Sequence, residues 1–169
     1  MSLPVTLAAL TEPEAHHRVA ESERLFMARA EQVMADRTVM FPPAGPTLKT
    51  LEDQGLRLGI GSTKPRRRLV SILEQEGLAG HFGVILGGGE VSAHQPDPWG
   101  LWLAAEQLGG APPEGLYVGG REFAAEGEQW GDVGFVVVLS GVTPKEAFRE
   151  YATVAILDTL NELPVVLAN

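Results

Sequence analysis

The sequence of 169 residues contains no cysteine, which excludes disulfide bonds, thiolate metal sites and cysteine nucleophiles. Positive charge is also scarce. The chain has 13 Lys and Arg residues but 22 Asp and Glu residues, which gives a formal net charge of −9. Phosphate backbones repel such a chain, so we expect no nucleic-acid partner. The longest apolar run, Phe135 to Leu139, is far shorter than the ~20 residues that cross a bilayer. We therefore expect no membrane span and, since no basic residue precedes the apolar N-terminal stretch, a cytoplasmic protein without a secretory signal.

Short apolar runs alternate along the chain with segments of helical spacing. Prolines open and glycines close several of these segments, as at Pro46 and Gly55. Strands that are separated by helices pair in parallel, with helices on both faces, so the pattern predicts one three-layer, doubly wound α/β domain over 1–169. The expected strands are 5–10, 56–60, 82–86, 116–118, 133–139 and 154–157. The expected helices are 46–54, 65–76, 98–108 and 123–128, and residues 11–35 are expected to form one long helix or a helical hairpin. Capping boxes are predicted at Thr11 with Glu14 and at Thr143 with Glu146.

Ligands bind such a sheet at the carboxyl ends of its strands. The strand at 56–60 is followed by Gly-Ser-Thr-Lys-Pro, so Ser62, Thr63 and Lys64 are candidates for binding phosphate or another anion at a helix N-terminus. Taken alone, the segment favours a simpler interpretation, in which Ser62 or Thr63 caps the helix. The basic cluster at 66–68 is likewise interpreted as a solvated helix face, with an anionic ligand or an acidic partner as the alternative.

Several stretches share their order and spacing with one protein family. They are GLRLGIGSTKP (55–65), LEQEGLAGHF (73–82), HQPDP (94–98), LYVGGR (116–121), VVLSGV (137–142) and ILDTLNEL (156–163). Together they resemble the phosphoglycolate-phosphatase-like branch of the haloacid dehalogenase (HAD) superfamily. The resemblance implies a Rossmannoid phosphatase fold with a helical cap, for which residues 12–43 leave room only in a reduced form.

The same resemblance implies a particular chemistry, from which this sequence departs. The family places two aspartates, two residues apart, at the end of its first strand. One of them attacks phosphorus and the other transfers protons. Further aspartates hold a Mg²⁺ ion beside them, and a lysine offsets the charge of the phosphate. In the best register, residues without these functions occupy the matching positions, namely Ala8, Leu10, Gln95, Gly120 and Ala124. No catalytic residue and no metal ligand is therefore assigned.

Three functional hypotheses follow from this departure. The leading one is a phosphatase homologue that has lost its catalytic aspartates and serves, without a cofactor, as a binding or assembly domain for a protein partner or a small phosphorylated ligand. The second is a Mg²⁺-dependent hydrolase of the phosphoglycolate-phosphatase type with a relocated acid pair, Glu12 and Glu122. The third is a sensor that binds phosphate or a phosphorylated metabolite at Ser62, Thr63 and Lys64 without turnover.

Overall fold

The computed structural model describes residues 3–88, 90, 99–121 and 133–168. The chain divides into two compact units, Met1–Val39 and Met40–Asn169. A cap is defined by its position over the functional site. The reduced cap expected at 12–43 therefore stays a prediction. Within the described ranges, no helix combines the length and the apolar character needed to traverse a bilayer.

The secondary structure of the described part of the first unit is helical. Its elements are α1 (Leu3–Ala9), η1 (Pro13–Arg18) and α2 (Val19–Arg37), and α1 contacts α2. The strand predicted at 5–10 is wrong, because residues 3–9 form a helix. The apolar run there is short and lacks strict alternation, so it is compatible with either structure, and its leucines and alanines favour a helix.

Thr11 ends α1 rather than starting the next helix. Its hydroxyl donates to the carbonyl oxygens of Leu7 at 3.0 Å and of Ala8 at 3.3 Å, and Glu12 is the residue that precedes η1. The capping box predicted at Thr11 is therefore wrong. The one predicted at Thr143 is wrong as well, because Pro144 precedes η6 (Lys145–Phe148) and no side chain caps it.

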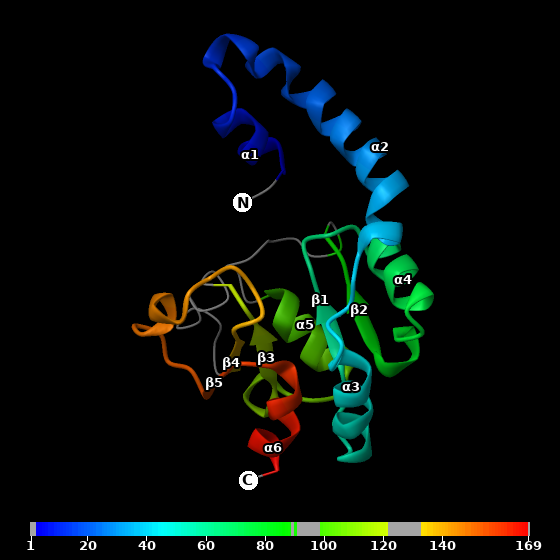
Figure 1. Ribbon diagram of the computed structural model, residues 1–169, viewed down its shortest axis with the longest axis vertical. Coiled ribbons are helices and arrows are strands. Elements are labelled where there is room, and N and C mark those ends of the chain that lie inside the picture. The colour runs from blue at the N-terminus through cyan, green and yellow to red at the C-terminus, as the bar shows by residue number, and fades with distance from the viewer. Residues whose placement is uncertain (1–2, 89, 91–98, 122–132, 169) are drawn as a thin grey trace. The chain divides into compact units, whose positions relative to one another are not determined.

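The second unit has the alternation of strands and helices that the sequence predicts (Figure 1). Five of the predicted strands and three of the predicted helices are found with shifted ends, and the helix predicted at 123–128 lies outside the described residues. The elements in chain order are α3 (Ala44–Asp53), β1 (Gly59–Gly61), α4 (Arg66–Gln75), η2 (Ala79–His81), β2 (Val84–Leu86), α5 (Trp99–Gln107), η3 (Pro112–Glu114), β3 (Leu116–Gly119), β4 (Gly134–Val138), η6, β5 (Ala155–Leu157), η7 (Leu160–Glu162) and α6 (Leu163–Leu167).

All strand pairs in the second unit are parallel, but they form two separate sheets. β1 pairs with β2, from Gly59 opposite Val84 to Gly61 opposite Leu86. β4 lies between β3 and β5 in a three-stranded sheet. The α/β class with parallel strands is thus confirmed, and each sheet brings its carboxyl strand ends together on one edge.

Helices cover both faces of the three-stranded sheet. Side chains alternate along β4, so Val136 and Val138 pack with α3 and α6, whereas Phe135 and Val137 pack with Phe148 of η6. Leu101 of α5 packs on the same side as Phe148. The arrangement is the three-layer sandwich that a parallel sheet requires, since both of its faces must be buried.

Candidate functional site

The loop after β1 carries the three residues predicted to bind an anion. The backbone N–H of Ser62 donates to the carbonyl oxygen of Leu86 at 3.0 Å, which continues the ladder between β1 and β2. The Ser62 hydroxyl accepts a hydrogen bond from the backbone N–H of Lys64 at 3.2 Å. Ser62 is half-buried, whereas Thr63 and Lys64 are exposed. The structure therefore brings the three predicted residues together in one turn at the carboxyl end of β1.

This turn leads into α4 without a side-chain cap. Pro65 occupies the N-cap position in an extended conformation, and no side chain forms a capping hydrogen bond. The interpretation of Ser62 or Thr63 as the helix cap is therefore wrong. Because the positive end of the α4 dipole lies beside the exposed Lys64, the turn has the electrostatic character that favours an oxyanion.

The loop after β2 crosses the turn formed by Ser62, Thr63 and Lys64 at very short range. A Cβ atom added to Gly87 would lie 2.2 Å from the backbone N of Arg66, and one added to Gly88 would lie 2.2 Å from the carbonyl oxygen of Thr63. The backbone N–H of Gly88 also donates to the carbonyl oxygen of Lys64 at 2.8 Å. Only glycine permits this approach, and the crossing holds the turn in place.

The basic cluster at 66–68 is split between different surroundings. Arg66 is exposed and directed back over the sheet, with its Nε donating to the carbonyl oxygen of Ile85 at 3.2 Å and lying 3.6 Å from Glu90 Oε1. Arg68 is buried, with a relative exposure of 8%. The prediction of one solvated face is therefore wrong for Arg68, because it precedes buried Ile72 by four residues and so shares its side of α4.

Glu90 is a contributor to the site that the sequence analysis missed. Its Oε2 accepts the backbone N–H of Gly87 at 2.8 Å, while its Oε1 faces Arg66. The carboxylate thus fixes the glycine crossing and partly neutralises Arg66, which leaves Lys64 as the cation of the turn. A signal was available, since a glycine run after a strand indicates a close backbone approach and the next acidic residue follows directly.

A second glycine crossing occurs at the carboxyl ends of β3 and β4. A Cβ atom on Gly120 would lie 2.7 Å from the carbonyl oxygen of Val138, and one on Gly141 would lie 3.1 Å from the carbonyl oxygen of Gly120. Gly120 is the position at which the resemblance to the HAD superfamily leads us to expect an acidic residue. A side chain there would have to displace backbone, so this loop is shaped around glycine.

The remaining predicted positions do not gather into one site. Ala8 lies in α1 and Leu10 directly follows it, so neither marks the end of a strand, and their assignment to the two aspartate positions is wrong. Glu12 belongs to the first unit and is exposed. Gln95, Glu122 and Ala124 lie outside the described residues. The relocated pair of Glu12 and Glu122 therefore stays a prediction.

The resemblance to the HAD superfamily implies Mg²⁺, but the described side chains do not provide a site for it. In the described ranges, no three His, Asp or Glu side chains come close enough together to hold a metal ion. Glu90, the acid beside the turn after β1, is already engaged by Gly87 and Arg66. The described residues alone thus do not form the set of oxygen ligands that Mg²⁺ prefers.

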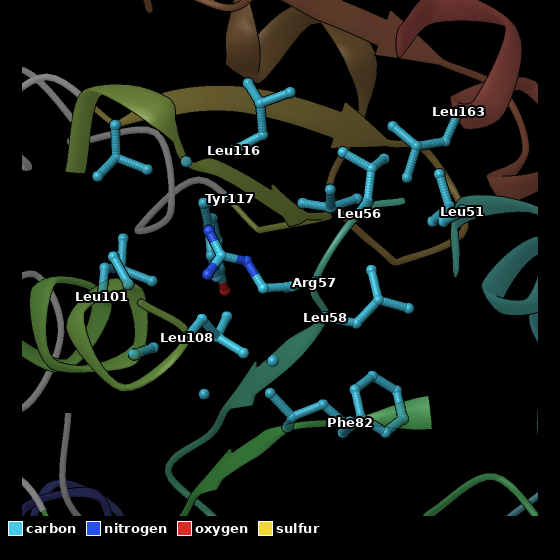
Figure 2. A pocket seen from close by; sticks show the side chains of 18 of the residues that line it. Leu51, Leu56, Arg57, Leu58, Phe82, Leu101, Leu108, Leu116, Tyr117 and Leu163 are labelled. Atoms are coloured by element: carbon cyan, nitrogen blue, oxygen red, sulfur yellow. The ribbon is translucent and has the colours of Figure 1, made fainter. Parts of the chain in front are cut away.

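The second unit also contains a cavity of about 470 Å³ (Figure 2). It is lined by the segment around β1, the segment around β3, and side chains of α3, α5 and α6. Figure 2 shows Leu51 and Leu163 approaching from one side and Leu101 and Leu108 from another. Arg57 reaches into it, but leucine side chains dominate its walls. The cavity is suited to an apolar occupant rather than to phosphate.

Comparisons with known proteins agree on one family. The sequence model of "Haloacid dehalogenase-like hydrolase" matches residues 5–138. The phosphoglycolate phosphatase of Escherichia coli (strain K12) is 35% identical over 105 residues, which are 62% of this chain and 42% of that protein. The phosphoglycolate phosphatase of Salmonella typhimurium is 30% identical over 149 residues, or 88% of this chain and 59% of that protein. The chain thus spans about half the length of these curated relatives.

Solved structures give the same result. A haloacid dehalogenase-like protein from Bacteroides fragilis has a TM-score of 0.88 and 34% identity, covering 96% of this chain and 77% of that one. A haloacid dehalogenase-like family hydrolase from Streptococcus pneumoniae has a TM-score of 0.83 at 15% identity, covering 99% of this chain and 77% of that one. At this lower identity the likeness concerns the fold alone.

Proposed function

Because the chain belongs to the haloacid dehalogenase-like hydrolase family, we propose that it is a phosphatase-like domain that binds a phosphate-bearing ligand without transferring the phosphoryl group. The observation that carries the binding proposal is the turn after β1, where Ser62 and Lys64 lie beside the uncapped start of α4. A serine hydroxyl, backbone N–H groups and a lysine charge form a phosphate-binding combination. The ligand class is therefore a phosphate ester or free phosphate.

The non-catalytic part of the proposal is supported by the second glycine crossing. Gly120 occupies a position where an acid is expected for metal binding, and its contact with Val138 leaves no space for a side chain. The sequence adds Gln95 and Ala124 at two further positions of the same mechanism. Ala8 and Leu10 give no support to the loss of catalysis, because they belong to a helical region and not to the end of a strand.

Phosphate should raise the melting temperature of the protein, and Ser62→Ala should reduce this shift. At a phosphate concentration ten times Kd, binding adds about 1.4 kcal/mol to the free energy of unfolding, which corresponds to a rise in melting temperature of roughly 3–6 °C for a domain of this size. At low salt, Lys64→Ala should reduce the melting-temperature shift more than Ser62→Ala does, because it removes a positive charge from the turn. Thermal unfolding with and without phosphate measures both effects.

Matched controls are available on the same unit. Ser71→Ala lies on the exposed side of α4 and Lys145→Ala lies in η6, so both should keep the full phosphate shift. A wild-type protein that phosphate does not stabilise would contradict the proposal, and so would a Ser62→Ala variant with an undiminished shift.

The names of the relatives favour a second candidate, a Mg²⁺-dependent phosphoric monoester hydrolase of the phosphoglycolate-phosphatase type. In that case Glu12 and Glu122 would take the place of the two lost aspartates, and Mg²⁺ would neutralise charge on the phosphoryl group. The proposal above instead predicts no turnover of an aryl phosphate above background and no heat of Mg²⁺ binding. Turnover that Glu12→Gln or Glu122→Gln abolishes, but Glu74→Gln on α4 does not, would replace the proposal by this alternative.

A further inference from the structure

The carboxylate of Glu90 is held in the way that proteins hold an external oxyanion. Its Oε2 accepts the backbone N–H of Gly87 at 2.8 Å, and its Oε1 lies 3.6 Å from Nε of Arg66. A backbone N–H and a guanidinium are common donors to bound carboxylates and phosphates. The loop after β2 and the start of α4 therefore form a site for one oxyanion, and a side chain of the protein itself occupies this site.

This carboxylate lies close to the turn after β1. Gly87 donates its backbone N–H to Glu90, and the next residue, Gly88, donates its own to the carbonyl oxygen of Lys64 at 2.8 Å. Since consecutive backbone nitrogens are close neighbours, the Glu90 carboxylate lies within about 10 Å of this carbonyl oxygen, which is the Debye length at about 0.1 M salt. Salt screens charges at such distances only in part, so Glu90 acts on any anion that the turn binds.

The ion pair between Arg66 and Glu90 is exposed and weakly held. The two side chains are 54% and 41% exposed. Nε of Arg66 also donates to the carbonyl oxygen of Ile85 at 3.2 Å, and both contacts that Arg66 makes within the described residues use this nitrogen. The terminal nitrogens of the guanidinium carry further N–H donors. Because exposed ion pairs contribute little to stability, an incoming anion can replace Glu90 at Arg66 with little loss.

From these contacts we propose that Glu90 is an internal competitor for the phosphate-bearing ligand, an inference that rests on the proposed phosphate binding at the turn after β1. In the free protein, the Glu90 carboxylate engages Arg66 and repels an approaching phosphate. When phosphate binds beside Ser62 and Lys64, Arg66 leaves Glu90 and pairs with the phosphate oxygens. The contact between Glu90 and Arg66 is therefore autoinhibitory, because it lowers the affinity of the turn for phosphate.

A purely structural role of Glu90 predicts the opposite effect on binding. If the carboxylate only held the glycine crossing in place through Gly87, its loss would loosen the turn and weaken phosphate binding. The loss of a competitor strengthens phosphate binding instead, since it removes a negative charge and releases Arg66. The direction of the change in affinity thus distinguishes the two roles.

The test measures the binding of inorganic phosphate to the full chain by calorimetry at low salt. Glu90→Gln removes the charge but keeps an oxygen that can accept the N–H of Gly87. We expect it to raise the affinity for phosphate at least about threefold, and the increase should shrink at high salt because the effect is one of charge. Glu74→Gln, on an exposed part of α4 two turns beyond Arg66, removes the same charge and should leave the affinity unchanged.

A second pair of variants tests whether Glu90 acts through Arg66. Arg66→Gln should weaken phosphate binding at least about twofold, whereas Arg149→Gln, which breaks another exposed ion pair, should not. When Glu90→Gln is added to Arg66→Gln, the affinity should rise less than it does in the wild type, because the side chain for which Glu90 competes is gone. Far-UV circular dichroism confirms that each variant is folded.

The outcomes separate this inference from the proposed function on which it rests. A wild-type protein that binds phosphate, with a Glu90→Gln variant that binds it equally or more weakly, overturns the inference alone. An equal rise in affinity with and without Arg66 also overturns it. If neither the wild type nor Glu90→Gln binds phosphate, the proposed function and the inference both fail. Binding by Glu90→Gln alone would support the competition and contradict the proposed function of the wild type.

Discussion

Substituting alanine for Gly88 should unfold the second unit or destabilise it by more than about 4 kcal/mol, the range in which a single substitution is exceptional. The added Cβ would lie 2.2 Å from the carbonyl oxygen of Thr63, and the obstructing atom belongs to the backbone, so it cannot rotate away. Relief requires the two loops to separate, which breaks the hydrogen bond from Gly88 to Lys64. Urea denaturation followed by far-UV circular dichroism measures the loss.

Gly80→Ala is the matched control for this substitution. A Cβ atom at Gly80 meets nothing within 4 Å, so this variant should stay within about 0.5 kcal/mol of the wild type. If Gly88→Ala unfolded at the same urea concentration as Gly80→Ala, the close crossing of the two loops would be disproved. The arrangement of the turn after β1, which depends on this crossing, would then need revision.

Phe148→Ala should lower the free energy of unfolding by about 3–5 kcal/mol, because it removes a large side chain that the surroundings cannot replace. Phe148 is 1% exposed, and its ring centroid lies 6.5 Å from that of Phe135 at an interplanar angle of 51°. The tilted ring contact contributes beyond the buried area alone. The substitution leaves a cavity against Val137, in the middle of the three-stranded sheet.

The control for Phe148 is Phe41→Ala, in the same unit at a position that is 54% exposed. Its cost should stay below about 1 kcal/mol, since most of this ring remains in water in the folded protein. Equilibrium unfolding in urea, monitored by tryptophan fluorescence, compares the two. A Phe148→Ala loss as small as that of Phe41→Ala would contradict the placement of η6 over β4.

The sequence predicts most of the second unit because its strands have a local signature. The runs at 84–86, 134–138 and 155–157 are continuously apolar and bounded by turn residues, as strands covered on both faces must be. The same signature fails at 5–10, where a short apolar run is equally compatible with a helix. That single error also removed Ala8 and Leu10 from the functional argument, since their importance rested on being at the end of a strand.

Other features of the site depend on contacts that no local pattern encodes. The buried side of Arg68 could have been inferred from its spacing to Ile72, but the engagement of Arg66 with Ile85 and Glu90 joins segments about twenty residues apart. The cavity between β1 and β3 depends on an even larger separation in the chain, because α4, β2 and α5 lie between these two strands. Such features depend on how whole strands and helices are arranged. Their residues can be recognised in the sequence only once that arrangement is known.

Strands β1 and β3, in which no residue is buried, also affect how the protein behaves in concentrated solution. Any extended chain that meets the open side of β1 or β3 finds a template for pairing, and nearby molecules are the most abundant source of extended chain during expression and storage. Loss of solubility should therefore begin at these strands rather than at the well-covered Val136 and Val137 of β4.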